Sequence, residues 1–211
     1  MRMLIMGAPG SGKGTQSEIL TEKLSIPAIS TGAMLRAAIA EGTEVGKEAS
    51  KYINDGKLVP DEVMINLVLD RISKEDCANG YILDGFPRTL AQAEAMTDAG
   101  IEIDTALMID VEDEAIMGRL GGRRVCGKCG ATYHTKFKPS SKGDKCEVCG
   151  EELTIREDDK PETIANRLKI YHETTAPVID YYREMGKLTT VKAVEGVEAT
   201  TELVLKALGK K

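Results

Sequence analysis

The sequence has 211 residues, enough for one well-packed α/β domain with insertions, and its formal net charge of −6 argues against non-specific binding to nucleic acid. No apolar run approaches the roughly 20 residues of a transmembrane helix. The apolar N-terminus soon meets glycines, which is typical of a buried strand rather than of a signal peptide. We therefore expect a cytoplasmic protein.

Segments with strand and helix patterns alternate along the chain. Apolar runs predict strands at residues 1–6, 26–29, 81–83, 106–109 and 188–194. Helical spacing predicts helices over 16–24, 31–40, 44–54 and 161–183, and a further helix that begins at Pro60-Asp61. This alternation predicts an α/β fold with a parallel, doubly wound sheet.

The first predicted turn has the composition of a phosphate-binding loop. Gly7 to Lys13 reads Gly-Ala-Pro-Gly-Ser-Gly-Lys and lies between a strand and a helix, as such loops do. Its glycines allow backbone N–H groups to surround phosphate oxygens, the helix N-terminus adds positive potential, and Lys13 adds a mobile cation. One position departs from the general pattern, because Gly14 stands where Ser or Thr is usual and Thr15 follows it. We predict a nucleoside triphosphate site, with a plain glycine-rich turn as the alternative.

Asp84 and a set of arginines extend this prediction. Asp84 ends a predicted strand and so lies at the carboxyl edge of the sheet, where open α/β folds bind ligands. A carboxylate there can hold Mg²⁺ directly or through water, although a turn or N-cap aspartate is the alternative. Arginine binds phosphate oxygens bidentately and stays charged, so a set of arginines around a phosphate loop predicts phosphoryl transfer. The segments singled out contain Arg36, Arg88, Arg119, Arg123, Arg124, Arg156 and Arg167.

Residues 122–159 interrupt the alternation, because they are polar, rich in glycine and too long for a plain loop. They contain two Cys-x-x-Cys pairs, Cys126 with Cys129 and Cys146 with Cys149. Two such pairs supply the four thiolates of a tetrahedral structural Zn²⁺ site, which leaves no open position for water or substrate. Disulfides are the alternative, and a reducing compartment disfavours them. We interpret the segment as a small appended unit held by zinc.

The remaining cysteine and the two histidines are assigned no chemistry. Cys77 is interpreted as an isolated buried thiol. His134 lies in the cysteine-rich segment, where four thiolates already suffice for a metal, and His172 is expected at the surface or in packing. Neither histidine is expected to act as a general base, because the acceptor in phosphoryl transfer to a phosphate is already ionised.

Several motifs together resemble the adenylate kinase family over essentially the whole chain. Gly7–Thr15 resembles that family's phosphate loop, including its Gly-Thr pair, and Asp84–Thr89, Asp-Gly-Phe-Pro-Arg-Thr, followed by Gln92 is similar to its most specific signature. Ser30-Thr31-Gly32 with Arg36 resembles its monophosphate motif, while Gly122-Arg123-Arg124 and Arg156–Asp159 resemble the two ends of its lid. The resemblance implies the reaction Mg-ATP + AMP ⇌ 2 ADP.

The resemblance also implies roles for single residues. Catalytic roles would fall to Lys13, Asp84, Arg88, Arg123, Arg156 and Arg167. Contacts with ATP are expected from Gly10, Ser11, Gly12, Lys13, Gly14, Thr15, Arg119, Arg123, Thr132, Tyr133 and Glu198, the last through its backbone. Contacts with AMP are expected from Thr31, Arg36, Lys57, Leu58, Val59, Gly85, Phe86, Pro87, Arg88, Gln92, Arg156 and Arg167.

The family architecture implies a P-loop nucleoside monophosphate kinase fold with a five-stranded parallel sheet. Its core would comprise residues 1–29, 60–121 and 160–211, with an α-helical AMP-binding insert at 30–59 and a small zinc-containing β lid at 122–159. The expected partners are ATP, AMP and ADP, and the expected state is a monomer. Ala33 departs from the family, which usually has Asp after Ser-Thr-Gly to help order water around the metal, so we expect modestly weaker use of Mg²⁺.

Three other functions compete with this interpretation. A kinase for UMP, CMP or GMP would share most of these motifs, although Thr31 and Gln92 favour adenine by resemblance. A P-loop GTPase is disfavoured by the lack of an Asn-Lys-x-Asp guanine motif. A zinc-ribbon module that binds nucleic acid would need an electrostatic footprint, which the near balance of charge in 122–159 does not provide.

Overall fold

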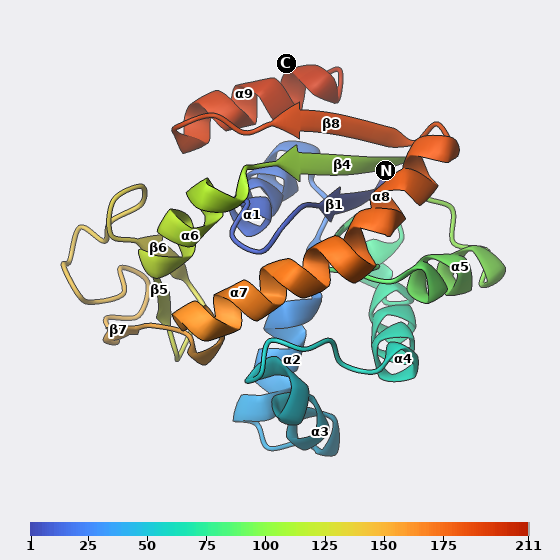
Figure 1. The fold of residues 1–211 in the computed structure, drawn as a ribbon. Helices are drawn as coiled ribbons and strands as arrows, with labels where there is room; N and C mark the ends of the chain where they lie inside the picture. Colours follow the sequence, from blue (N-terminus) through green and yellow to red (C-terminus); the bar gives the residue numbers. More distant parts are fainter. Residues whose placement is uncertain (211) are drawn as a thin grey trace.

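A five-stranded parallel sheet in the order β2-β3-β1-β4-β8 forms the centre of the computed structural model, which describes residues 1–210 (Figure 1). Its strands are β1 (Arg2–Met6), β2 (Ala28–Ser30), β3 (Tyr81–Asp84), β4 (Thr105–Asp110) and β8 (Leu188–Lys192). Every pairing in this sheet is parallel. The predicted doubly wound sheet is therefore confirmed, and its strands lie where the apolar runs placed them.

Helices cover both faces of the sheet, and side chains alternate between two separate cores along each strand. Met3 and Ile5 of β1 pack with α1 and α9, whereas Leu4 and Met6 pack in the larger cluster on the opposite face, to which α4–α8 contribute. The helices are α1 (Lys13–Leu24), α2 (Thr31–Ala40), α3 (Glu44–Ile53), α4 (Asp61–Ile72), α5 (Leu90–Asp98), α6 (Asp113–Gly121), α7 (Pro161–Ile170), α8 (Ala176–Glu184) and α9 (Val197–Ala207). Among residues 1–210, none of these helices is long and apolar enough to cross a membrane.

The helix predicted over 161–183 is interrupted. A π-helical turn, η3 (Tyr171–Thr175), separates α7 from α8, and the backbone N–H of Ala176 donates to the carbonyl oxygen of Tyr171, five residues back. Pro177 lies in the first turn of α8, where its missing N–H would leave the carbonyl four residues earlier without a donor. Two shorter 3₁₀ turns, η1 (Glu75–Cys77) and η2 (Glu157–Asp159), complete the set.

Two parts of the chain project from the sheet domain (Figure 1). Helices α2 and α3 form a hairpin in which Gly46 lies so close to α2 that an added Cβ would be 2.1 Å from the carbonyl oxygen of Ala38. The second part is an antiparallel sheet of β5 (Arg123–Cys126), β6 (Thr132–His134) and β7 (Leu153–Thr154), in the order β6-β5-β7. Its small apolar cluster shares no residue with the two cores of the main sheet.

Candidate active site

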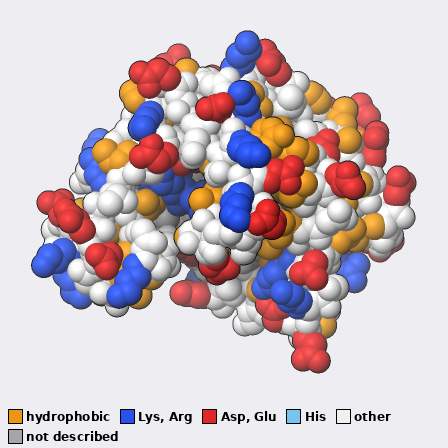
Figure 2. Space-filling model, turned by 90° about the horizontal axis from the view of Figure 1, so that it is seen from below, with side chains coloured by type: hydrophobic (Ala, Val, Ile, Leu, Met, Phe, Trp, Pro, Cys, Tyr) orange, Lys and Arg blue, Asp and Glu red, His pale blue; other side chains and the backbone are white. Residues whose placement is uncertain are grey.

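A cavity of about 1640 Å³ opens at the carboxyl ends of β1 and β3 and extends along β5 and β6 of the smaller sheet. Figure 2 shows a hollow beside that smaller lobe, with Lys and Arg side chains at its bottom. A typical pocket for one small molecule measures roughly 300–1,000 Å³, so this cavity has room for more than one. A smaller cleft of about 80 Å³ adjoins it between α2, α3 and β3, and Arg36, Arg88 and Arg167 line both.

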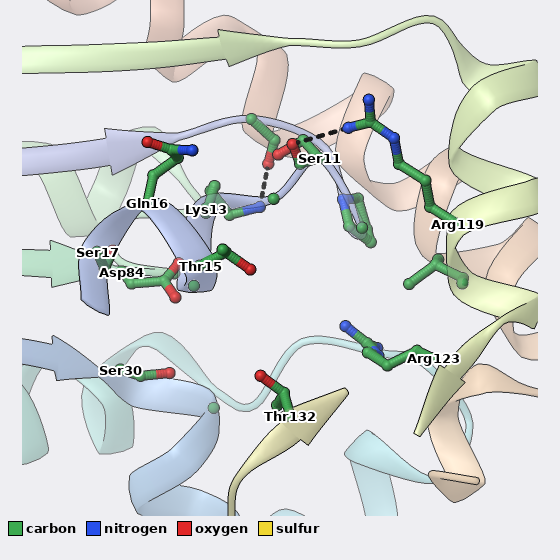
Figure 3. A pocket seen from close by; sticks show the side chains of 18 of the residues that line it. Ser11, Lys13, Thr15, Gln16, Ser17, Ser30, Asp84, Arg119, Arg123 and Thr132 are labelled. Carbon is green, nitrogen blue, oxygen red and sulfur yellow. Dashed lines mark hydrogen bonds between the residues drawn. The ribbon is translucent and has the colours of Figure 1, made fainter. Parts of the chain in front are cut away.

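The glycine-rich loop forms one wall of the cavity (Figure 3). Gly10 and Gly12 have φ angles of +79° and +98°, a region that side chains with a Cβ rarely adopt. The loop leads directly into α1, whose first N–H groups have no acceptors within the helix. The Ser11 hydroxyl is buried and has no hydrogen-bond partner within residues 1–210. Unpaired donors around an open space are what a phosphate would satisfy.

Lys13 points back across this loop. Its ammonium group donates to the carbonyl oxygens of Gly7 at 2.7 Å and Ala8 at 2.8 Å. Burial lowers the pKa of Lys13, Asp84 opposes that shift, and Arg88, Arg167 and Arg123 add to it, so that the pKa is about 8. A bound anion would stabilise the charged form of Lys13 and so raise this lowered pKa.

Asp84 and Arg119 flank the loop on two sides. Asp84 ends β3, and its carboxylate lies beside Gly14, since a Cβ on that glycine would be 3.8 Å from Oδ2 of Asp84. Arg119, near the end of α6, donates to the carbonyl oxygen of Ser11 at 3.2 Å (Figure 3). The sequence predicted both residues near the loop, and the structure brings them there.

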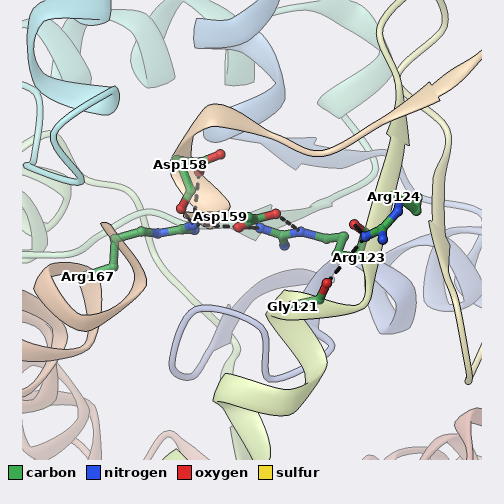
Figure 4. Close-up of polar contacts among 6 residues, drawn as sticks. All are labelled: Gly121, Arg123, Arg124, Asp158, Asp159 and Arg167. Atoms are coloured by element: carbon green, nitrogen blue, oxygen red, sulfur yellow. Dashed lines mark hydrogen bonds and ion pairs between the residues drawn. The ribbon is translucent and has the colours of Figure 1, made fainter. Parts of the chain in front are cut away.

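Two arginines and two aspartates form an ion cluster where the β5–β7 sheet meets α7, here called the Arg–Asp cluster (Figure 4). Arg123 of β5 forms a two-point ion pair with Asp159, in which its Nε donates to Oδ2 at 2.6 Å. Arg167 of α7 donates to the same carboxylate at 3.0 Å and to the carbonyl oxygen of Asp158 at 2.7 Å. The Asp159 side chain is fully buried, so one carboxylate joins the two segments.

The other arginines of the cavity repel one another. Burial lowers the pKa of Arg156, and Arg123 and Arg36 lower it further, with only Asp158 and Asp159 opposing. Burial is also the main cause of the lowered pKa of Arg36. Guanidinium groups stay protonated in proteins, so buried arginines that repel one another favour a negative charge placed among them.

The residues predicted for AMP gather around the smaller cleft and its border with the main cavity. The hydroxyl of Thr31 donates to the carbonyl oxygen of Gly85 at 3.0 Å. The buried Gln92 amide is already engaged, because its Oε1 accepts from the backbone N–H of Arg88 at 2.7 Å and its Nε2 donates to Asp61 at 2.7 Å. Asp61 therefore orients Gln92, a role that sequence reasoning did not assign.

One predicted ATP contact lies apart from the rest. Glu198 is exposed on α9 and does not line the cavity, whereas Val194–Val197 and Thr200 do. Thr132 and Tyr133, on β6, line the cavity as predicted. The segment after β8 carries no charged motif, so only its position at the end of a parallel strand marked it as part of a binding edge.

The four cysteines of 122–159 come together. Their Sγ atoms all lie within 4.8 Å of one another, with Cys126 and Cys149 at 3.4 Å and Cys129 and Cys146 at 3.5 Å. A tetrahedron with Zn–S bonds of about 2.3 Å has S–S edges of about 3.8 Å, so the four thiolates fit a structural zinc ion. Each pair ends in a glycine with a φ of +77°, Gly130 or Gly150, which closes the turn onto the first cysteine's carbonyl oxygen.

Tyr133 connects this cluster to the cavity. Its hydroxyl accepts from the backbone N–H of Glu147 at 2.9 Å and lies 3.5 Å from the Sγ of Cys146. A zinc-bound thiolate can only accept a hydrogen bond, so in a zinc site the Tyr133 hydroxyl would donate to this sulfur. No sequence pattern predicts this contact, because it joins residues on separate turns of the unit.

Of the two histidines and Cys77, only His134 lines the main cavity. His134 uses Nδ1 to accept from the backbone N–H groups of Lys136 and Phe137. His172 is exposed and 2.9 Å from a carboxylate oxygen of Asp113. Cys77 is buried in η1.

Comparisons with known proteins agree on one family. The family model described as "Adenylate kinase" matches residues 5–187. The chain is 52% identical to the adenylate kinase of Caldicellulosiruptor bescii, over 99% of each chain. It is 49% identical to that of Lachnoclostridium phytofermentans and 48% identical to that of Clostridium botulinum, in both cases over 100% of this chain and 99% of the relative.

Proposed function

Since this chain belongs to the adenylate kinase family, we propose that its own residues divide the work of phosphoryl transfer between two half-sites that share a ring of arginines. The enzyme transfers a phosphoryl group reversibly from Mg-ATP to AMP, giving two ADP. The observation that carries the residue assignment is the convergence of Lys13, Arg36, Arg88, Arg123, Arg156 and Arg167 on one cavity.

The glycine-rich loop is the ATP half-site. Backbone N–H groups of Gly10–Thr15, the Ser11 hydroxyl and the Lys13 ammonium would hold the ATP phosphates, and Arg119 would hold the loop from α6. The adenine would lie near Thr132 and Tyr133 and against the backbone of the segment after β8, where Val194–Val197 and Thr200 line the cavity and Glu198 does not.

The smaller cleft is the AMP half-site. Its adenine would lie among Thr31, Lys57–Val59 and Gln92, and its phosphate would meet Arg36 and Arg88. Because Gln92 is fixed by Asp61 and by the backbone of Arg88, its amide would present a preset orientation to the base. A kinase for another nucleoside monophosphate remains the alternative, and a panel of AMP, GMP, CMP and UMP tests it.

The transfer itself needs position and positive charge rather than a protein nucleophile. An oxygen of AMP phosphate attacks the γ-phosphorus of ATP, and the bond to the β-phosphate oxygen breaks, leaving ADP on both sides. Arg88, Arg123, Arg156 and Arg167 would stabilise the charge on the moving group, and Asp84 would hold the Mg²⁺ that arrives with ATP, directly or through water. Ala33 lies at the cavity with no side-chain oxygen, so an Ala33→Asp variant should use Mg²⁺ better; an unchanged dependence contradicts this.

Residues 122–159 would act as the lid and 30–59 as the AMP-binding insert, on a core of 1–29, 60–121 and 160–211. The zinc ion would supply no chemistry to the transfer and would only hold the lid turns together. Closure would exclude water from the transferred group. The reduced thiolates that this site requires fit a cytoplasmic, reducing compartment, and we propose a monomer that does not bind nucleic acid.

The assignment is tested by removing one arginine at a time and following ADP formation in a coupled assay. Arg88→Ala should lower kcat by about 10²–10³-fold, since it removes a charged donor from the reacting group. Arg36→Ala should chiefly raise KM for AMP. Arg183→Ala, which lies in an exposed ion pair on α8, serves as the control. Retention of full kcat by Arg88→Ala would sink the assignment.

A further inference from the structure

The π-helical turn between α7 and α8 brings one side chain onto the loop that carries Arg88. The hydroxyl of Thr175, a residue only 9% exposed, donates to the carbonyl oxygen of Arg88 at 3.0 Å. Residues in an α-helix are separated by about 100° of rotation, so the extra residue of the turn sets the direction in which Thr175 points. π-turns of this kind occur frequently at functional sites.

Arg88 is fixed at three points. Its backbone N–H donates to Gln92, its Nε donates to the carbonyl oxygen of Gly85 at 2.8 Å, and its own carbonyl oxygen accepts from Thr175. Gln92 and Gly85 belong to the same loop and the helix that follows it. Thr175 is the one partner of the three that comes from a distant segment.

The segment that carries Thr175 also carries Arg167. Arg167 and Arg88 repel each other, since Arg167 is the largest cause, after burial, of the lowered pKa of Arg88. Two like charges that are to hold one phosphoryl group need rigid supports, because a shift of about 1 Å in such groups costs about 10²-fold in rate. The hydrogen bond from Thr175 links the segment that carries Arg167 to the loop that carries Arg88.

We propose that Thr175 is a positioning residue for the AMP half of the reaction: through the Arg88 carbonyl, it holds the Arg88 guanidinium where the AMP phosphate binds. The inference rests on the role proposed for Arg88 above. It assigns a purpose to the π-turn, whose extra residue rotates the helix by about 100° and places the Thr175 hydroxyl at this carbonyl.

Thr175→Val tests this, because it preserves the shape of the side chain and removes only the donor. We expect kcat/KM for AMP to fall about tenfold, while the Kd for ATP stays within twofold of the wild type. Thr174→Val is the matched control, since the Thr174 hydroxyl donates to the carbonyl oxygen of Ile170 at 2.7 Å within the same turn and does not contact Arg88. It should keep its activity with AMP.

The result is read from the split between the two substrates. Unchanged kcat and KM for AMP in Thr175→Val would overturn the inference. An equal loss of activity in Thr174→Val, or an equal loss of ATP affinity in Thr175→Val, would overturn it too, because either result shows a merely structural role. If Thr175→Val does not fold, Thr175→Ser and Thr175→Ala differ by the hydroxyl alone, and only the serine variant should approach wild-type activity.

Arg88→Ala separates this inference from the function on which it rests. If the alanine variant is as active as the wild type, the role of Arg88 itself is wrong. If the alanine variant is impaired while Thr175→Val is not, only the role of Thr175 is wrong.

Discussion

Replacing Asp159 by asparagine should destabilise the nucleotide-free enzyme, because one buried carboxylate pairs with two arginines. Oxygens of Asp159 lie 2.6 Å from Nε of Arg123 and 3.0 Å from Nη1 of Arg167. At an effective dielectric constant of 20, a pair of charges about 4 Å apart attracts by about 4 kcal/mol. Removing one partner of a buried pair typically costs about 3–5 kcal/mol.

The expected effect lies at the lower end of that range. The Arg123 and Arg167 side chains are 19% and 18% exposed, so water recovers part of their solvation, and asparagine still offers one acceptor oxygen. We expect a loss of about 3 kcal/mol in the free energy of unfolding. For a protein of this size, that loss lowers Tm by about 6–12 °C.

Calorimetric thermal unfolding at low salt measures this difference. Asp180→Asn is the matched control, because Asp180 also pairs with an arginine, Arg183, but both side chains are more than half exposed. An exposed pair contributes at most about 1 kcal/mol, so the control should unfold within a few degrees of the wild type.

A second arm adds saturating ADP. Under the proposed function, phosphates bring negative charge to Arg123 and Arg167, so ADP should narrow the gap in Tm between Asp159→Asn and the wild type. Equal Tm values for Asp159→Asn and Asp180→Asn would refute the reasoning about burial. A gap that widens with ADP would show that the carboxylate serves the complex rather than the free enzyme.

Three further outcomes are expected. Gly46→Ala should lower the free energy of unfolding by about 2 kcal/mol, since its Cβ would be 2.1 Å from the carbonyl oxygen of Ala38. Gly118→Ala in α6, where the added Cβ would have no atom within 4 Å, should raise it by about 0.5–1 kcal/mol. Thermal denaturation compares the two variants. ATP affinity should be constant below pH 8 and should fall above it, approaching a tenfold loss per pH unit. The reason is that Lys13, with its pKa of about 8, must take up a proton that the bound phosphates then retain. Calorimetry in buffers of different ionisation enthalpy should detect this proton uptake, and its absence would contradict the assignment. Tyr133→Phe should weaken zinc binding about tenfold, as outer contacts to metal ligands typically do, measured by transfer to a chromogenic chelator; equal affinity would show that the hydroxyl does not act on the sulfur.

The sheet, the glycine-rich loop and the cysteine cluster could be predicted from the sequence because each follows from a local pattern of residues. Short, mostly apolar runs predicted every strand of the main sheet, and the spacing of Cys126, Cys129, Cys146 and Cys149 predicted a cluster that the structure forms. These features need no knowledge of which distant residues meet.

The features that were not predicted depend on such meetings. Helices α5, α6 and α9 were not predicted. The buried faces of α5 and α9 include Gln92, Thr200 and Thr201, which break the apolar stripe that marks a helix. The run Glu157–Asp159 has the composition of a solvated surface, yet Asp159 is fully buried by its two arginines. The π-turn follows from a proline that the periodicity of 161–183 did not take into account.

The double-sided burial of β1 has a consequence for how the fold is specified. Since Met3, Leu4, Ile5 and Met6 are all buried and apolar, sliding the strand by one residue would exchange the two cores without exposing hydrophobic surface. The penalty for misalignment must therefore come from the strand ends. Gly7 provides it, because any Cβ there would be 2.4 Å from the carbonyl oxygen of Ile109. Gly7, which opens the glycine-rich loop, thus also specifies the alignment of β1 in the sheet.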